Sequence, residues 1–228
     1  RWMTPQVISD RILLRMAPVA LGAGIYQVNL GIDMIIASLL PSGSISYLFF
    51  ADRVNQLPLG VIGVAVGTAL LPLLSRQLRA GDLAAAQNSQ NRALEISLFL
   101  TLPAAAALVI IAEPIILVFF GRGAFDAFAV NATARALAAY AWGIPAYVLI
   151  KALATFYFAA EDTKTPIQIG LAAIAVNIIL NLALMGPFLH VGLARASAIS
   201  AWLNAALLAI VLIRRGHFRI DKRLARAL

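Results

Sequence analysis

The sequence contains no cysteine and two histidines in 228 residues. Without cysteine, neither a disulfide nor a thiolate metal site can form. His190 and His217 stand apart, near the ends of apolar segments, and do not form a ligand pair. The sequence motifs of a serine nucleophile elbow, a phosphate-binding loop and a zinc protease are all missing. We therefore expect no enzyme, no firm metal site and no organic cofactor.

Charged residues are scarce, at 12%, whereas 62% of residues are hydrophobic and the mean hydropathy is +0.89. Soluble domains average about 25% charged and about 45–50% apolar residues. Six segments reach the roughly 20 apolar residues that span a bilayer, and open sheet edges are not tolerated in hydrocarbon. The sequence therefore predicts an all-α polytopic membrane protein, a six-helix bundle with helices at about 16–40, 44–71, 93–120, 134–160, 165–185 and 192–213.

The net charge is +8, which in a soluble protein would suggest nucleic-acid binding. Here most cationic residues flank apolar segments, so we expect topology, not nucleic acid, to explain them. With the N-terminus placed in the cytoplasm, the opposite side holds three of the eighteen Lys and Arg residues: Arg122, Arg135 and Arg195. The cytoplasmic side holds thirteen: Arg1, Arg11, Arg15, Arg76, Arg79, Arg92, Lys164, Arg214, Arg215, Arg219, Lys222, Arg223 and Arg226. This bias predicts that both ends of the chain are cytoplasmic.

Both ends of the sequence also carry information. Residues 214–228 form a basic run, predicted to be a cytoplasmic tail resting on anionic lipid headgroups, with a dedicated partner site as the alternative. The first residues, Arg1 to Pro5, lack the layout of a signal peptide and do not start with methionine. We expect the chain to be part of a longer protein.

Two cations fall inside predicted spans, where a charge costs at least ~2.5 kcal/mol near the helix centre. Arg53, in the run Ala-Asp-Arg, is predicted to form a substrate site with its neighbour Asp52 and to bind an anion there, because a guanidinium offers phosphate two parallel hydrogen bonds. The alternatives are neutralisation by Asp52 or snorkelling to the interface. Lys151 is predicted to line the same cavity as Arg53; alternatively it snorkels or binds a backbone carbonyl.

Helix-breaking and small residues follow Arg53 along the same segment: Pro58, Gly60, Gly63 and Gly67. Proline bends a helix, and glycines allow close approach of a neighbouring backbone. These residues are consistent either with a flexible helix in a moving gate or with simple close packing.

Polar side chains in three other spans suggest a cation site. Asp33 lies in the first segment, Asn177 and Asn181 are one helical turn apart in the fifth, and Ser197 and Ser200 lie in the sixth. Oxygen ligands of this kind suit Na+ or another hard cation, or the carboxylate could take a proton. The alternative is that these groups hold the bundle together by interhelical hydrogen bonds.

Two stretches resemble the MurJ/MviN family of the multidrug/oligosaccharidyl-lipid/polysaccharide exporter superfamily. The first runs from Tyr47 to Arg53 and continues through Leu57–Thr68 and Leu71–Ser75, and the second comprises Phe156-Tyr157 with Asp162–Pro166. The resemblance covers essentially the whole chain. It implies one lobe of a two-lobe exporter, with the N-terminal lobe missing from this chain.

The resemblance also implies a function. Members of the family flip lipid II, the undecaprenyl-pyrophosphate-linked peptidoglycan precursor, across the bacterial inner membrane by alternating access. Their cavity arginine falls on Arg53, and the cation site of some members falls near Asp33, Asn177, Asn181 and Ser197. Lipid II and membrane lipids are thus the expected partners, and Na+ or H+ the expected coupling ion. The alternatives are another lipid-linked oligosaccharide or drug exporter, or a non-transporting scaffold for cell-wall synthases.

Overall fold

The structure is a computed structural model that describes residues 31–218, and every regular element in that range is a helix. Residues 31–38 are helical and belong to the first predicted span, of which residues 16–30 lie outside the described part. The other helices are α2 (Ser44–Arg79), α3 (Leu83–Ile110), α4 (Ala112–Phe120), α5 (Ala127–Ala141), α6 (Ile144–Ala159) and α7 (Lys164–Arg214).

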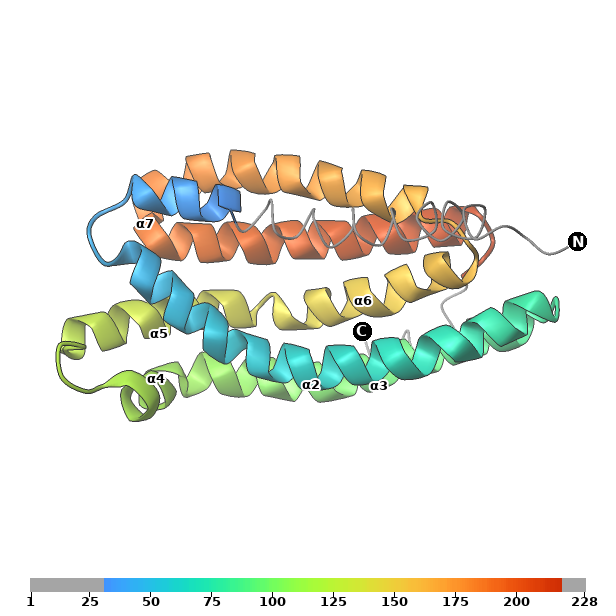
Figure 1. The fold of residues 1–228 in the computed structure, drawn as a ribbon, viewed down its shortest axis with the longest axis horizontal. Coiled ribbons are helices and arrows are strands. Elements are labelled where there is room, and N and C mark those ends of the chain that lie inside the picture. Colours follow the sequence, from blue (N-terminus) through green and yellow to red (C-terminus); the bar gives the residue numbers. More distant parts are fainter. Residues whose placement is uncertain (1–30, 219–228) are drawn as a thin grey trace, which may run out of the picture.

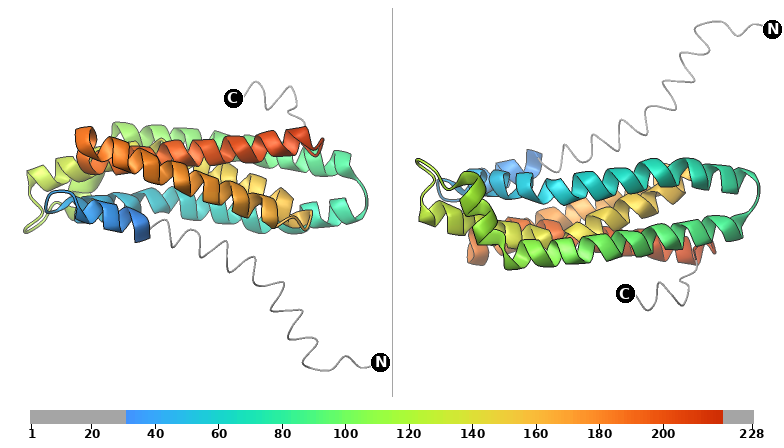
Figure 2. Two further views of the ribbon diagram at one scale, coloured as in Figure 1. Left: turned by 90° about the horizontal axis from the view of Figure 1, so that it is seen from above. Right: turned by 90° about the horizontal axis from the view of Figure 1, so that it is seen from below.

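The helices run back and forth along one long axis, as the views in Figures 1 and 2 agree. Within residues 31–218, four helical stretches are long and apolar enough to cross a membrane: Ser44–Arg79, Leu83–Ile110, Ala127–Ala159 and Lys164–Arg214. The last has 51 residues, about 77 Å of helix at 1.5 Å per residue, which is far longer than the ~30 Å hydrocarbon layer. Non-helical backbone at Leu189 divides it, and its two arms lie side by side in Figure 1. The chain is therefore an all-α, multi-pass membrane protein.

Two helices extend beyond the predicted apolar segments because polar residues continue them. α2 runs to Arg79 rather than to about residue 71, and α3 begins at Leu83 rather than at about residue 93. Asp82 starts α3 by accepting a hydrogen bond from the backbone N–H of Ala85 at 2.9 Å, the usual role of an N-cap carboxylate. Hydropathy alone does not detect such polar helical turns.

Two predicted spans are interrupted by proline. The third changes direction at Ile111, between α3 and α4, and Pro114 lies in the first turn of α4. The fourth breaks at Trp142 and Gly143, between α5 and α6, with Pro145 in the first turn of α6. Proline has no N–H to donate and its ring clashes with the carbonyl four residues earlier, so a helix can begin at such a residue but cannot run through it unbent.

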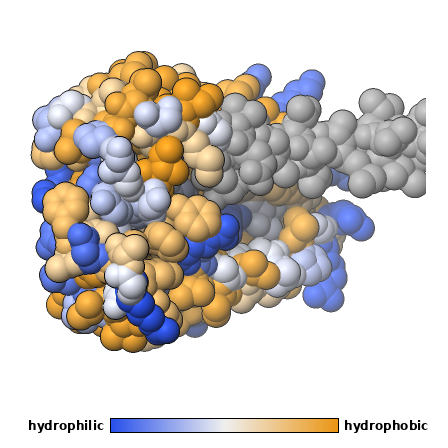
Figure 3. Space-filling view, turned by 60° about the vertical axis from the view of Figure 1, so that its left-hand side comes forward, coloured by the Kyte–Doolittle hydropathy of each residue, from blue (hydrophilic) through white to orange (hydrophobic). Residues whose placement is uncertain are grey.

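Helix α6 lies inside the bundle and contacts α2, α3 and α7. One buried apolar cluster includes Ile116, Leu137 and Leu193, and a second includes Leu74, Phe156 and Leu208. Outward-facing side chains are also apolar: Phe99 is 77% exposed and Ile110 78%. Figure 3 shows apolar residues over much of one face, with hydrophilic side chains in small groups. A surface of this kind suits hydrocarbon rather than water.

Candidate functional site

Arg53 and Asp52 have separate partners on α2. The Arg53 side chain is exposed, and its guanidinium carbon lies 4.8 Å from the ring centre of Phe49, one turn earlier. Asp52 is half-buried and accepts a hydrogen bond from the side-chain amide of Gln56, one turn later. The Asp52 carboxylate is thus held by an amide, and the Arg53 guanidinium lies by the ring of Phe49 on an exposed part of α2.

Lys151 reaches α2 from the neighbouring helix α6. A Cβ placed on Gly63 would lie 2.8 Å from Lys151 Cδ and 2.9 Å from its Nζ, so the lysine side chain occupies the space that glycine leaves. Gly63 follows Arg53 by ten residues, about 15 Å along the axis at 1.5 Å per residue. Arg53, Gln56, Gly60, Gly63 and Gly67 are spaced alternately by three and four residues, and hence share one face of α2. We call this set the α2 face; the structure brings both cations to it.

The other glycines of the α2 face meet no neighbour among the described residues. A Cβ at Gly60 or Gly67 would have nothing within 4 Å. Close packing of a neighbouring helix therefore does not explain these two glycines within residues 31–218. Pro58 lies inside α2, which bends along its length in Figure 1, as expected for proline within a helix. Among residues 31–218, the α2 face is thus a bent surface that bears two cations and has open space at Gly60 and Gly67.

The predicted polar cluster forms where residues 31–38 meet the two arms of α7. Asn181 Nδ2 donates to Asp33 Oδ1 at 2.7 Å and to Asn177 Oδ1 at 3.0 Å. Asn177 Nδ2 lies 3.5 Å from Ser197 Oγ and 3.4 Å from Ser200 Oγ. With the Asn177 amide turned over, its nitrogen donates instead to Asp33 Oδ1 at 3.1 Å and its oxygen accepts from the Ser197 N–H. Either orientation joins all four predicted residues.

This cluster has the chemistry of a hard-cation site. Asn177 and Asn181 are at most 1% exposed, and Asn181 Oδ1 accepts no hydrogen bond within the described part. An orphaned buried oxygen beside a carboxylate is a suitable ligand for Na+ or a comparable ion. No three His, Cys, Asp or Glu side chains gather among residues 31–218, so the donor set there does not match a transition-metal centre.

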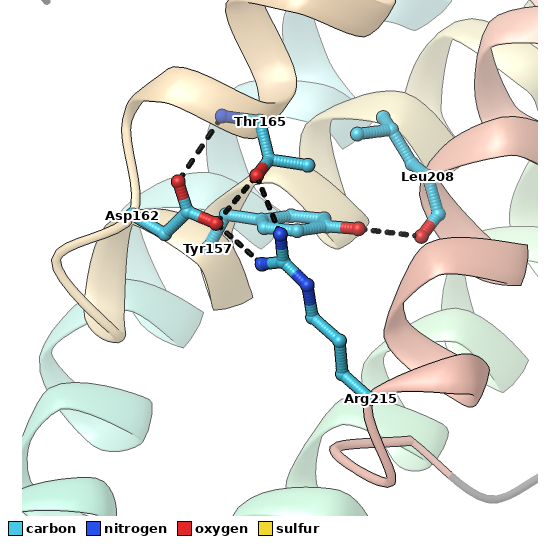
Figure 4. Close-up of polar contacts among 5 residues, drawn as sticks. All are labelled: Tyr157, Asp162, Thr165, Leu208 and Arg215. Carbon is cyan, nitrogen blue, oxygen red and sulfur yellow. Dashed lines mark hydrogen bonds and ion pairs between the residues drawn. The ribbon is translucent and has the colours of Figure 1, made fainter.

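One polar contact was not predicted, and it lies where the first and last residues of α7 meet, away from the polar cluster. Asp162 pairs with Arg215 at 2.6 Å, and Thr165 bonds to both residues (Figure 4). Partial burial raises the pKa of Asp162, but the hydrogen bonds from Thr165 and Arg215 outweigh it and lower the pKa below its usual 3.8. The pair is 53 residues apart in the sequence, and no local spacing could have revealed it.

Comparison with known proteins places the chain in a family. Residues 3–227 match the family model described as "Lipid II flippase MurJ". A "Probable lipid II flippase MurJ" of Rhizobium meliloti (strain 1021) is 47% identical over 219 residues, which are 96% of this chain and 40% of that protein. The protein of the same description in Rhizobium tropici is 47% identical over 223 residues, 98% of this chain and 41% of that protein. The chain therefore spans about two fifths of the length of these relatives.

A solved structure with a similar fold points to the same family. A structure titled "Lipid II flippase MurJ, inward closed conformation" superposes with a TM-score of 0.82 at 28% identity, covering 100% of this chain and 47% of that one. An outward-facing multidrug resistance MATE family transporter of the MOP superfamily gives a TM-score of 0.76 at 16% identity, covering 92% of this chain and 48% of that one, a likeness of fold alone. Together, the family model, the relatives and the fold show that this chain belongs to the MurJ lipid II flippase family.

Proposed function

We propose that this chain is one lobe of a transporter that flips lipid II across the bacterial inner membrane by alternating access. The α2 face would form half of the wall of a cavity shared with a second lobe, which the relatives' greater length can supply. Arg53 would bind the pyrophosphate of lipid II, and Lys151 would add a second positive charge farther along the wall. Membrane lipids would contact the apolar outer surface. No bond in the substrate is broken, so the residues need only bind and release it.

The exposure of Arg53 is the observation that carries this proposal. A guanidinium kept within an apolar span is costly unless something outside the lobe compensates it. Its neighbour Asp52 is engaged by Gln56, and beyond Gln56 the α2 face carries glycines, two of which meet no neighbour among residues 31–218. A phosphate ligand satisfies the donors of an arginine fork.

We also propose that the polar cluster couples transport to Na+ or H+. Asp33 and the orphaned oxygen of Asn181 would provide ligands, with Asn177 and Ser197 completing the set. Neutralising Asp33 in the substitution Asp33→Asn should remove any dependence of transport on sodium or pH. This role would be contradicted if the dependence of transport on sodium and on pH were the same in Asp33→Asn as in the parent.

Both ends of the chain are proposed to be cytoplasmic. Helix ends bearing Arg76, Arg79, Lys164, Arg214 and Arg215 gather at one end of the bundle, as the positive-inside rule requires. Because the sequence has no cysteine, single cysteines in place of Thr163 and Ala124 would report the two sides with a membrane-impermeant maleimide in spheroplasts. We expect labelling of the cysteine at 124 alone; labelling only at 163 would reverse the orientation.

The substrate role is tested in a chimera in which this chain replaces the matching segment of a full-length relative, expressed in cells depleted of their own flippase. Arg53→Ala should abolish growth, and Arg53→Lys should restore it poorly because an ammonium lacks the bidentate fork. The matched control is Arg195→Ala: Arg195 is also exposed and also lies over an aromatic ring, 4.3 Å from the centre of Phe188, but on α7. Equal growth of both alanine variants would refute the role of Arg53.

A further inference from the structure

The break between α5 and α6 is attached to one short segment of α7. Trp202 Nε1 donates to the carbonyl of Trp142 at 2.9 Å. A Cβ on Gly143 would lie 3.2 Å from the Cα of Ala198, so the chain at the break is pressed against α7. The hydroxyl of Tyr147, in the first turn of α6, donates to the carbonyl of Ser197 at 3.3 Å. All three contacts fall on residues 197–202.

The same segment of α7 faces the polar cluster through its side chains. Ser197 Oγ and Ser200 Oγ lie within 3.5 Å of Asn177 Nδ2, and Ser200 Oγ also donates to the Ser197 carbonyl at 3.1 Å. The Ser197 carbonyl therefore accepts from Tyr147 and from a serine that contacts the cluster. Any change in the cluster that turns or shifts this part of α7 reaches Tyr147 directly.

Tyr147 in turn lies one helical turn before Lys151. Residues four apart lie on the same face of a helix, so the tilt of the first turn of α6 determines where the lysine side chain runs. Next to Lys151 the backbone of α6 is held by Gln90 of α3, which donates to the carbonyl of Ala152 at 3.1 Å, whereas the Lys151 side chain itself crosses Gly63 of α2. A displacement at Tyr147 is therefore expected to shift the Lys151 side chain along the α2 face.

We infer that Tyr147 is a positioning residue that links the occupancy of the polar cluster to the placement of Lys151. The link is contiguous: Asp33, Asn181 and Asn177 reach Ser197 by hydrogen bonds, Ser197 reaches Tyr147 through its carbonyl, and α6 connects Tyr147 to Lys151. This inference rests on the proposed function for its purpose, but the link itself is a property of the lobe.

The link is measured at Lys151 in the chain reconstituted in lipid nanodiscs. The chain has three lysines, Lys151, Lys164 and Lys222, so the acylation rate of each by a water-soluble succinimidyl ester can be followed by mass spectrometry. Asp33→Asn neutralises the cluster as a bound cation or proton would. We expect Asp33→Asn to change the Lys151 rate by about threefold to fivefold, the effect of one hydrogen bond, and to leave Lys164 unchanged.

A double-mutant cycle then isolates the contribution of Tyr147. Tyr147→Phe removes only the hydroxyl, and in its presence Asp33→Asn should no longer alter the Lys151 rate. Tyr157→Phe is the matched control, because Tyr157 also joins α6 to α7 by donating to a backbone carbonyl, that of Leu208 at 2.8 Å, but far from the cluster. The effect of Asp33→Asn should persist in Tyr157→Phe. If Asp33→Asn folds poorly, Ser197→Ala perturbs the same cluster from α7.

The outcomes separate this inference from the proposed function. An unchanged Lys151 rate in Asp33→Asn, or an effect that survives Tyr147→Phe or is lost equally in Tyr157→Phe, overturns the link. The growth test of the Arg53→Ala chimera does not depend on any of these acylation results. If that chimera loses lipid II transport, the flippase role therefore stands even where the link fails. Conversely, a cycle that shows coupling in a lobe whose Arg53→Ala chimera still supports growth retains the link and refutes the function.

Discussion

Gly63 is the point at which the placement of Lys151 can be changed without removing its charge. In Gly63→Ala the new methyl would start 2.8 Å from Lys151 Cδ, 2.9 Å from Nζ and 3.3 Å from Cε. Carbon atoms in contact prefer about 3.5–4.0 Å, so the lysine must move by roughly 1 Å. These three atoms all belong to the far end of a flexible side chain, so the Lys151 side chain, not the backbone, is expected to move.

The energies predict little change in folding. Alanine in place of glycine within a helix stabilises by about 0.5–1 kcal/mol, and an off-rotamer lysine costs about 0.5–1.5 kcal/mol, so the two effects roughly cancel in Gly63→Ala. Gly60→Ala and Gly67→Ala are matched controls in the same helix, because their Cβ atoms would meet nothing within 4 Å in the part of the chain that the structure describes. They should show the full helical gain of about 0.5–1 kcal/mol.

Three measurements on the variants test this reasoning. Unfolding in detergent gives the stability of each variant, lysine acylation gives the position of Lys151, and growth supported by the chimera gives transport. We expect Gly63→Ala alone to alter the Lys151 rate and to impair growth more than either control does, with its stability within about 1 kcal/mol of the parent. If Gly63→Ala matches Gly60→Ala in all three assays, Lys151 does not lie across Gly63.

Two further predictions concern α7, one where its two ends meet and one at its central kink. Because the folded state lowers the pKa of Asp162, it favours the carboxylate; this stabilisation is present above pH 3.8 and is lost as the pH falls through the lower folded value. The Arg215 side chain is 44% exposed, so the pair should contribute less than about 1 kcal/mol, and acid titration of stability should lack this component in Asp162→Asn. At the kink, Leu189 has φ +50° and ψ −134°, which glycine adopts without strain. Leu189→Gly should therefore raise the unfolding free energy by about 1 kcal/mol, and a loss of stability by thermal unfolding would show that the leucine side chain matters more than its backbone.

The sequence revealed the spans and the unusual side chains, because both are local properties. A run of apolar residues predicts a helix in the membrane, and Arg53, Lys151 and Asp33 stand out from such runs without any knowledge of their neighbours. The breaks at Ile111 and Trp142 are marked by Pro114 and Pro145, and these two prolines, given more weight, would have divided the third and fourth spans. The meeting of Asp33 with Asn181 was predicted from polar residues in otherwise apolar spans, and the resemblance to the family pointed to the same residues.

The remaining features depend on contacts between distant segments. Tyr147 is an ordinary aromatic residue in an apolar helix, and its contact with Ser197 spans 50 residues. The sequence shows that Arg215 belongs to the basic run after the last span, but it does not show that Arg215 pairs with Asp162. Similarly, the sequence does not distinguish the three glycines of α2, although Gly63 accommodates a lysine and Gly60 and Gly67 meet no neighbour among the described residues. Such roles are set by packing, which periodicity does not encode.

The most direct test of the central claim is the affinity of the purified chimera for lipid II, measured with and without Arg53. A hydrogen bond to a charged group is worth about 1.5–3 kcal/mol, so Arg53→Ala should raise the dissociation constant by about tenfold to a hundredfold. Arg195→Ala, which removes the same charge from α7, should leave it unchanged. An equal affinity in Arg53→Ala and the parent would contradict the claim that this guanidinium holds the pyrophosphate.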